Sequence, residues 1–309
     1  MMKTALLFAG QGSQTIGMGH DLYERFDVCR ELFDQANDVL GRDLRKICFE
    51  GPEDVLTRTD NTQPGIFLTS MACLAALKTQ VPNLEFSATA GLSLGEFTAL
   101  TTAEAMGFGD ALRLIQARAR FMQEACEATG GGMAAIMGMD DTALAEVCRE
   151  ADVDIANLNC PGQTVISGEK DRIAKAVELA KARGAKRAMP LTVAGAYHSR
   201  LMESARGKLA TELARVPVHL PLVPVVSNVT ARPAASVAEI KELLVRQVTS
   251  SVRWSDSMQW LVGQGFTRFI ELGPGQVLSG LMKRINKDVE MLSVSDSATL
   301  DATAARLTV

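Results

Sequence analysis

Apolar and polar residues follow one another in blocks that predict short buried strands, each followed by an amphipathic helix. Residues 4–9 form an apolar run that ends at a glycine, which is typical of a buried strand entering a turn. Residues 21–40 carry apolar side chains at helical spacing, and Gly41 follows where a helix-terminating glycine belongs. Residues 86–91 predict a second strand, followed at once by a helix from about residue 94. The same patterns predict helices over 63–77 and 108–126, and strands over 223–227 and 268–271.

The segment 129–193 has a different pattern of elements and begins at the glycines 130–132. Its hydrophobic pattern predicts strands over 133–139, 154–158, 163–167 and 186–191, and helices over 141–150 and 171–183. This β-α-β-β-α-β order is that of the ferredoxin-like fold, so 129–193 is predicted to be a ferredoxin-like inserted subdomain.

The remaining residues, 1–128 and 194–309, are predicted to form one larger catalytic domain. Strands that alternate with helices favour a parallel sheet with helices on both faces. The predicted fold class is therefore α/β, with a hydrolase-like parallel-sheet core and the inserted subdomain. The tail from Ser295 is small and polar, and it is expected to fray.

Composition limits the classes of function. The chain has 309 residues, of which 47% are hydrophobic, enough for a sizeable core. The net charge of −4 argues against a nucleic-acid partner, because phosphate contacts need a basic excess. No run reaches about 18 uncharged apolar residues, so no membrane span is expected. The apolar run near the N-terminus is too short for a secretion signal, and a cytoplasmic location is the expectation.

Cysteines and histidines give no sign of a disulfide framework or a metal site. The six cysteines are scattered and form no C-x-x-C pair, which favours reduced thiols. The three histidines are His20, His198 and His219, and no two of them stand at metal-ligand spacing. Neither a metal nor a cofactor is predicted.

Residues 91–95 form a G-x-S-x-G motif between a predicted strand and a predicted helix. In that context a sharp turn exposes the Ser93 hydroxyl, and glycines on both sides leave room for a strained backbone. The helix start adds N–H groups and the positive end of the helix dipole, which favour a developing oxyanion. The alternative is an ordinary strand-turn-helix corner in which the serine only caps the helix.

A nucleophilic serine needs a base, and histidine is the usual one. His20 lies in an N-terminal loop, and His219 lies in an extended stretch next to a proline, so both are interpreted as structural. His198 stands where the predicted subdomain returns to the larger domain, a position suited to a cleft.

A series of motifs extends along the chain, over residues 10–14, 91–96, Arg118 with 121–123, 159–168, 195–202, 227–229, Gln247 with 252–254, and 271–275. Together, and in this order, these motifs resemble those of malonyl-CoA:acyl carrier protein transacylases. The resemblance extends from about residue 3 to residue 285. The acyltransferase domains of polyketide synthases and animal fatty acid synthases share this plan, so the resemblance supports the family more firmly than the pathway.

The resemblance implies a catalytic set. Ser93 is the expected nucleophile and His198 the base, then the acid, and a carbonyl oxygen at the position of Gln247 holds the histidine. Two backbone N–H groups, those of Gln11 and Leu94, are expected to form the oxyanion hole. The sequence alone favours the simpler interpretation of Gln247 as a solvated helix residue.

The resemblance also implies residues that choose the acyl group. Arg118 is expected to pair with the free malonyl carboxylate through two parallel hydrogen bonds, although a solvated helix arginine is the simpler interpretation. In polyketide relatives a bulky aromatic at the position of Tyr197 accompanies malonyl rather than a methyl-branched acyl group. Leu92 departs from the family, in which the residue before the nucleophile is commonly histidine.

The implied reaction moves a malonyl group from malonyl-CoA to the phosphopantetheine thiol of acyl carrier protein, in fatty acid biosynthesis, through an ester on Ser93. A monomer is the family expectation. Carrier proteins are acidic, so basic residues near the cleft are expected either to dock the carrier or merely to be scattered solubilising charges. These basic residues are Arg200, Arg206, Lys208, Lys283, Arg284 and Lys287.

Three other functions remain open at this point. They are a trans-acting acyltransferase of a polyketide pathway, an acyl-CoA thioesterase or other hydrolase, and a non-catalytic protein that docks a carrier. A lipase-type hydrolase usually has its histidine late in the chain, whereas here the last one is His219.

Overall fold

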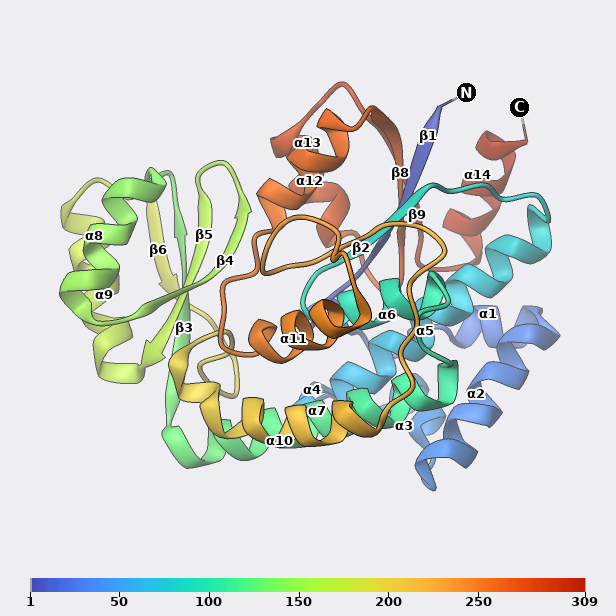
Figure 1. The fold of residues 1–309 in the computed structure, drawn as a ribbon, viewed down its shortest axis with the longest axis horizontal. Coiled ribbons are helices and arrows are strands. Elements are labelled where there is room, and N and C mark those ends of the chain that lie inside the picture. Colours follow the sequence, from blue (N-terminus) through green and yellow to red (C-terminus); the bar gives the residue numbers. More distant parts are fainter. Residues whose placement is uncertain (1, 309) are drawn as a thin grey trace.

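The computed structural model describes residues 2–308, and nine strands in this range form two separate sheets (Figure 1). The strands are β1 (Lys3–Phe8), β2 (Ala88–Gly91), β3 (Gly131–Met137), β4 (Asp154–Cys160), β5 (Gln163–Glu169), β6 (Arg187–Pro190), β7 (Val225–Val226), β8 (Phe266–Leu272) and β9 (Glu290–Val294). The helices are α1 (His20–Arg25), α2 (Asp27–Leu40), α3 (Leu44–Glu50), α4 (Glu53–Thr57), α5 (Thr59–Gln80), α6 (Leu94–Thr102), α7 (Phe108–Thr129), α8 (Asp141–Ala151), α9 (Lys170–Ala182), the short 3₁₀ turn η1 (Arg200–Met202), α10 (Glu203–Arg215), α11 (Val237–Gln247), α12 (Trp254–Gly263), α13 (Val277–Ile285) and α14 (Ser297–Leu307).

The larger sheet is parallel, with the strand order β7-β2-β1-β8-β9. Side chains of β1, the central strand, point alternately into two cores on opposite faces of the sheet. Leu6 and Phe8 pack in the core that contains α2, α5, α6 and α7, whereas Ala5 and Leu7 pack against α12 and α13 on the opposite face. Both faces are therefore buried, as a parallel sheet requires, and the predicted α/β class with a parallel-sheet core is confirmed.

The smaller sheet is antiparallel, with the order β4-β5-β3-β6, and lies at one end of the molecule with α8 and α9 (Figure 1, green and yellow). Its elements follow the β-α-β-β-α-β order that the sequence predicts. One face packs on α8 and α9, while Met133, Ala156 and Val165 join the large core. Val252 also exchanges backbone hydrogen bonds with the edge strand β4, so the two sheets are held together beside α12.

Two predicted helices have different bounds in the structure. The region 21–40 is broken at Phe26, whose backbone is extended, into α1 and α2. Helix α5 starts at Thr59, one turn before Pro64, although a proline inside a helix removes a backbone hydrogen bond. The carbonyl of Asp60, which would have accepted that bond, instead accepts from the side chains of Arg42 and Gln116.

The expectation that the tail frays is wrong, because it forms helix α14. Asp296 and Thr299 make reciprocal side-chain to backbone bonds at its start, a capping box. Leu300 and Ala304 are buried in the large core, and this packing stabilises a segment whose composition is merely polar. Over residues 2–308 no helix combines the length and the apolar character that a bilayer crossing demands.

Candidate active site

Ser93 occupies the sharp turn between β2 and α6. Its φ of 54° lies in the left-handed region that residues with a side chain rarely adopt. A Cβ on Gly91 would lie 1.9 Å from the Gly95 carbonyl carbon, and a Cβ on Gly95 would lie 2.2 Å from the Phe8 carbonyl oxygen. Glycine is therefore required on both sides of the serine, because strand, turn and helix approach one another too closely for any side chain.

His198 reaches Ser93 from the segment that returns from the antiparallel sheet. Its Nε2 lies 2.8 Å from Ser93 Oγ, and its Nδ1 lies 2.8 Å from the backbone carbonyl oxygen of Gln247. Gln247 ends α11, where carbonyl groups lack a partner inside the helix. The carbonyl fixes the proton on Nδ1, so Nε2 is left to accept the Ser93 hydroxyl proton.

Arg118 approaches the same hydroxyl from α7 and is only 1% exposed. Its Nη2 donates to Ser93 Oγ (3.0 Å) and to Gln247 Oε1 (2.9 Å), and its Nη1 donates to Gln63 Oε1 (2.6 Å). Its Nε has no hydrogen-bond partner within residues 2–308, and none of the ion pairs in this range includes Arg118. The interpretation of Arg118 as a solvated helix residue is therefore wrong, and its guanidinium has only neutral partners.

A buried polar network holds the turn in place. The Gln247 side chain is fully buried, so its interpretation as a solvated helix residue is wrong. Its Nε2 donates to the Ser93 carbonyl (3.0 Å) and to Glu96 Oε2 (2.7 Å). Asn228 Oδ1 accepts from the Ser93 N–H at 2.6 Å, and its Nδ2 donates to the last carbonyl of β2. The Asn228 N–H donates to Glu96 Oε2 at 3.0 Å.

Sequence reasoning assigned no role to three of these residues, Glu96, Asn228 and Gln63. One signal was present for Glu96, because it is the only charged residue in α6, whose sequence is otherwise small or apolar. A lone acid on such a helix is either a functional or a hydrogen-bonded group, since an unpaired buried carboxylate is costly. Asn228 lies in the motif over 227–229, but that motif assigned it no role, and Gln63 had no comparable signal, because neutral amides are common in loops and helix starts.

The residues predicted to form an oxyanion hole lie beside the turn. Gln11 and Ser93 line the same cavity, and Leu94 is the first residue of α6. Within residues 2–308 neither the Gln11 nor the Leu94 backbone N–H donates a hydrogen bond. Free donors next to a nucleophile are what a developing oxyanion requires.

Tyr197 is buried beside His198, and its hydroxyl lies 2.6 Å from Thr59 Oγ1 and 3.3 Å from the side-chain nitrogen of Gln11. These two bonds hold the ring at the wall of the cavity. Leu92 lines the same cavity, so the position that departs from the family presents an apolar side chain to it.

A cavity of about 550 Å³ opens at Ser93 and is lined by both parts of the molecule. The parallel-sheet part contributes Ser93, His198 and Leu92, and the antiparallel sheet contributes Met133, Asn157 and Val165. The volume lies in the range of small-molecule sites. Arg118 is not part of the lining, because it sits behind Ser93 and Gln63.

Burial dominates the ionisation of the cluster. Burial, reinforced by the charge of Arg118, lowers the pKa of His198 to about 4, so its imidazole is neutral at pH 7 and able to accept a proton. Burial also lowers the pKa of Arg118 to about 10, against an opposing effect of Glu96, and the guanidinium stays charged at pH 7. Burial raises the pKa of Glu96 to about 7, although the N–H groups of Asn228 and Gln247 favour its anion.

The remaining histidines lie outside this site. His20 is exposed and contacts Glu24 and Phe49, and the N–H of exposed His219 donates to the Ala105 carbonyl. Within residues 2–308 no three His, Cys, Asp or Glu side chains form a group that could hold a metal ion.

The basic residues proposed for carrier docking differ in their surroundings. Arg200, Arg206 and Lys208 form ion pairs with carboxylates of this chain. Arg284 donates to Gln163 Oε1, which lines the cavity, at 2.6 Å. Lys283 and Lys287 are exposed.

The chain is similar to known proteins over nearly its whole length. The acyl transferase domain model matches residues 5–302. The malonyl CoA-acyl carrier protein transacylase of Bacillus subtilis is 46% identical over 306 residues, covering 97% of this chain and 96% of that protein. The protein of the same name in Haemophilus influenzae is 40% identical over 306 residues, covering 98% of each chain.

Solved structures agree. The acyl-carrier-protein S-malonyltransferase of Bartonella henselae superposes with a TM-score of 0.95 at 40% identity, covering 100% of both chains. A malonyl-transacylase solved in complex with a type II polyketide synthase acyl carrier protein gives a TM-score of 0.95 at 39% identity, covering 98% of this chain and 99% of that one. The resemblance that the sequence motifs suggest is thereby confirmed, and this chain belongs to the acyl transferase family.

Proposed function

We propose that this protein transfers a malonyl group from malonyl-CoA to the phosphopantetheine thiol of an acyl carrier protein, through an ester on Ser93. The observation that carries this proposal is the convergence of two groups on one hydroxyl. His198 Nε2 lies 2.8 Å and Arg118 Nη2 lies 3.0 Å from Ser93 Oγ, in a cavity with room for a small substrate. The relatives named malonyl CoA-acyl carrier protein transacylase supply the choice of substrates.

In the first half-reaction His198 Nε2 takes the Ser93 hydroxyl proton while Oγ bonds to the thioester carbonyl carbon. The carbonyl oxygen becomes an oxyanion, which the N–H groups of Gln11 and Leu94 stabilise. When the tetrahedral intermediate collapses, the carbon–sulfur bond breaks, and coenzyme A leaves with the proton from His198. Ser93 then carries the malonyl group as an ester.

The second half-reaction reverses these steps with a different thiol. His198 takes the proton of the phosphopantetheine thiol, whose sulfur attacks the ester carbonyl carbon. The Ser93 oxygen leaves and recovers its proton from His198. The carbonyl of Gln247 keeps the imidazole ring in one tautomer and orientation throughout, without adding a negative charge.

Arg118 recognises the free carboxylate of the malonyl group in this proposal. Its present partners, Ser93 Oγ and the amide oxygens of Gln63 and Gln247, are neutral acceptors that a carboxylate outcompetes. A carboxylate that replaces Ser93 Oγ and Gln63 takes two parallel hydrogen bonds from Nη1 and Nη2. The Tyr197 ring narrows the cavity and thereby disfavours an acyl group with a methyl branch.

The pathway is proposed to be fatty acid biosynthesis, which the resemblance to malonyl-CoA:acyl carrier protein transacylases implies. A polyketide pathway is the second candidate, because one similar structure is the complex of a malonyl-transacylase with a polyketide carrier protein. Purified carrier proteins of both kinds, offered in competition, distinguish the two by their kcat/KM values.

We further propose a division of the chain into domains and a location in the cell. Residues 1–128 and 194–309 form the catalytic domain and 129–193 the ferredoxin-like subdomain, because the second sheet has its own core with α8 and α9. Buried, unbridged cysteines fit a cytoplasmic location.

The test is the mass of the intact protein after incubation with malonyl-CoA. The wild type should gain one malonyl group, and Ser93→Ala should gain none. Ser204→Ala, an exposed serine on α10, is the matched control and should label like the wild type. Labelling of Ser93→Ala would refute the proposal, and release of free malonate at the same rate with and without carrier protein would indicate a hydrolase instead.

Removal of the Arg118 guanidinium, the proposed clamp for the malonyl carboxylate, provides a second test. Arg118→Ala should lose the preference for malonyl over acetyl, by at least about 10²-fold in kcat/KM, since each of the two hydrogen bonds to a charged group contributes about 1.5–3 kcal/mol. Some acetyl transfer should remain. An equal loss for both acyl groups contradicts the proposed role of Arg118.

A further inference from the structure

The active-site cluster contains two buried groups of opposite charge that do not touch. Arg118 is 1% exposed and Glu96 is 3% exposed. The side-chain amide of Gln247 lies between them, with Oε1 accepting from Arg118 Nη2 at 2.9 Å and Nε2 donating to Glu96 Oε2 at 2.7 Å. The amide therefore links the guanidinium to the carboxylate in a defined orientation, with its oxygen toward the cation and its nitrogen toward the anion.

This arrangement meets two conflicting requirements of a substrate-binding arginine. A buried guanidinium needs a counter-charge, because an uncompensated charge in the interior is strongly destabilising. A carboxylate bonded directly to Arg118 would occupy the donors that the substrate carboxylate needs. With one amide between the charges, Glu96 compensates Arg118 while the direct partners of the guanidinium remain neutral and displaceable.

Glu96 also contacts the two residues that hold the reacting groups. Its Oε2 accepts from the side chain of Gln247, whose backbone carbonyl holds His198, and from the backbone N–H of Asn228, whose side chain holds the Ser93 N–H. A single carboxylate oxygen thus connects the supports of the nucleophile and of the base.

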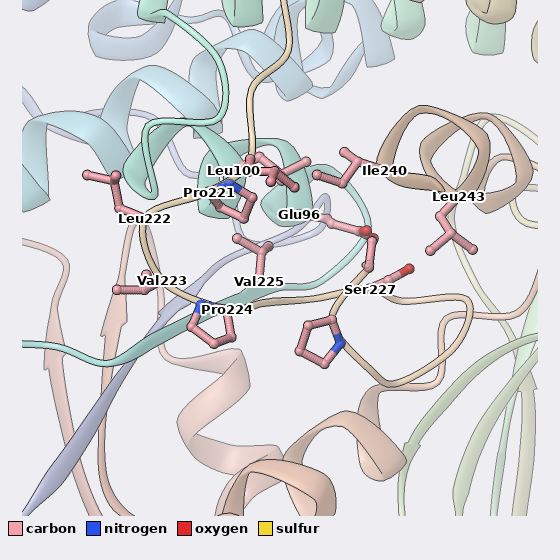
Figure 2. Close-up of a pocket in the computed structure, with 13 residues that line it drawn as sticks. Glu96, Leu100, Pro221, Leu222, Val223, Pro224, Val225, Ser227, Ile240 and Leu243 are labelled. Carbon is pink, nitrogen blue, oxygen red and sulfur yellow. The ribbon is translucent and has the colours of Figure 1, made fainter. Parts of the chain in front are cut away.

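Glu96 faces a second pocket, which Figure 2 shows, and no residue that lines this pocket also lines the cavity at Ser93. The pocket measures about 260 Å³ and is otherwise mainly apolar, with Leu100, Ile240 and Leu243 around the acid and Ser227 next to it. A proton can therefore reach Glu96 without passing through the substrate cavity.

We propose that Glu96 is a positioning residue that acts through Gln247 and Asn228, and that its negative charge limits the preference of the site for malonyl over acetyl. This inference rests on the proposed role of Arg118 as the carboxylate clamp. With Glu96 ionised, the free site is neutral, with one cation and one anion. A malonyl carboxylate adds a second anion, which Glu96 repels, whereas an acetyl group adds none.

The charge of Glu96 changes in the working pH range, because burial raises its pKa to about 7. Arg118 is the charged side chain that acts on Glu96 from α7, and burial lowers its pKa only to about 10. The other titratable groups of the cluster are His198, neutral above a pKa of about 4, and Tyr197, neutral below a pKa of about 12. Gln247 on α11 and Ser227 and Asn228 after β7 have no charge.

The experiment measures single-turnover acylation of Ser93 by malonyl-CoA and by acetyl-CoA between pH 5.5 and 8.5. In this range the malonyl carboxylate stays ionised, since an unperturbed carboxyl has a pKa of about 4. The ratio of the two kcat/KM values cancels every titration that affects both acyl groups alike. In the wild type the ratio should fall about four- to thirtyfold as the pH rises through about 7, as for two charges about 8–10 Å apart at an effective dielectric constant of about 20–40.

Two variants separate the charge of Glu96 from its hydrogen bonds. Glu96→Gln keeps an acceptor oxygen but has no charge, so its ratio should be independent of pH and equal to the acidic limit of the wild type. Glu96→Leu removes the bonds to Gln247 and Asn228, so acylation by both acyl groups should slow about 10–100-fold. Glu271→Gln is the matched control, because Glu271 is also fully buried but bonds the start of α13, and its ratio should follow the wild-type profile.

The outcomes distinguish this inference from the proposed function. A wild-type ratio without pH dependence, or a Glu96→Gln ratio that still falls through pH 7, overturns the charge effect. Acetylation of Glu96→Leu at the wild-type rate overturns the positioning role. An unchanged malonyl preference in Arg118→Ala overturns the clamp itself, whereas its loss together with a pH-dependent Glu96→Gln ratio leaves the clamp intact and rejects only the role of Glu96.

Discussion

Replacement of Arg118 by alanine should raise the pKa of His198. Ser93 Oγ lies 2.8 Å from His198 Nε2 and 3.0 Å from Arg118 Nη2, so the two nitrogens are at most about 6 Å apart. At an effective dielectric constant of about 20, two unit charges at that distance interact by about 3 kcal/mol, or about two pKa units. This is an upper limit, because water can enter the space that the side chain leaves.

The direction of the shift follows from which form of the imidazole the cation disfavours. Arg118 repels protonated His198, so its removal makes protonation easier and the pKa rises from about 4. Burial is the larger cause and persists in the variant, so the pKa should stay below the ordinary value of 6.5. The kcat/KM for acetyl transfer, which needs neutral His198, should therefore begin to decline at a higher pH in Arg118→Ala than in the wild type.

The assay is an NMR titration of the imidazole protons. The chain has only three histidines, so substitution of His20 and His219 by glutamine leaves His198 as the single signal. Arg113→Ala is the control, since Arg113 lies on the same helix with 61% of its side chain exposed and pairs with Asp110. A pKa of His198 that falls or stays constant in Arg118→Ala would show that the guanidinium does not act on the base.

Four further predictions concern the turn, the cavity and stability. Gly91→Ala should reduce Ser93 labelling by at least about 10²-fold, because its Cβ would lie 1.9 Å from a backbone carbon and displace the nucleophile; wild-type labelling contradicts this. Asn228→Ala should slow acylation by either acyl-CoA about tenfold or more in stopped-flow measurements, since the Ser93 N–H loses its acceptor at 2.6 Å; a malonyl-specific loss would point to substrate binding instead. Tyr197→Ala should raise the kcat/KM for methylmalonyl-CoA relative to malonyl-CoA about 10–200-fold in competition assays, while Tyr197→Phe should leave the ratio near wild type. The pKa of His198 is lower in the folded protein than in the unfolded chain, so the free energy of unfolding should fall by up to about 3 kcal/mol as the pH falls from 6.5 toward 4. Urea unfolding of His198→Asn should not show this decrease, and identical pH profiles for the variant and the wild type would refute the prediction.

Local pattern was sufficient to predict most elements but not all of their limits. Strands such as β1 and β2 are short apolar runs bounded by glycines and polar residues, so both the strands and their ends can be recognised in the sequence. Helix α5 begins before Pro64 because side chains from α7 and the loop before α3 bond the carbonyl that the proline leaves free. Helix α14 exists because Leu300 and Ala304 find a core to pack against. Both differences come from partners distant in the sequence.

The amino-acid sequence was sufficient to locate the strand-turn-helix corner at Ser93 and to indicate the family. Gly91 and Gly95 are needed for purely local reasons, because the backbone folds back on itself within a few residues, and such constraints are visible as a motif. With three histidines in the chain, the pairing of His198 with Ser93 could also be predicted from the sequence, and the structure places the two side chains in contact. The sequence could not show whether Gln247 and Arg118 face solvent or the interior.

The burial of Gln247 and Arg118 became visible only in the folded molecule. Gln247 and Ser93 are 154 residues apart in the chain and Asn228 and Ser93 are 135 apart, yet their side-chain bonds hold the turn. The structure also buries Glu96 and Arg118 on either side of one amide. Burial is a property of the whole packed molecule, and it changes the strength of every charge and hydrogen bond by altering the surrounding dielectric. The residue types at the site were readable from the chain, but the electrostatics that give them their chemistry arose only when the two sheets and their helices packed together.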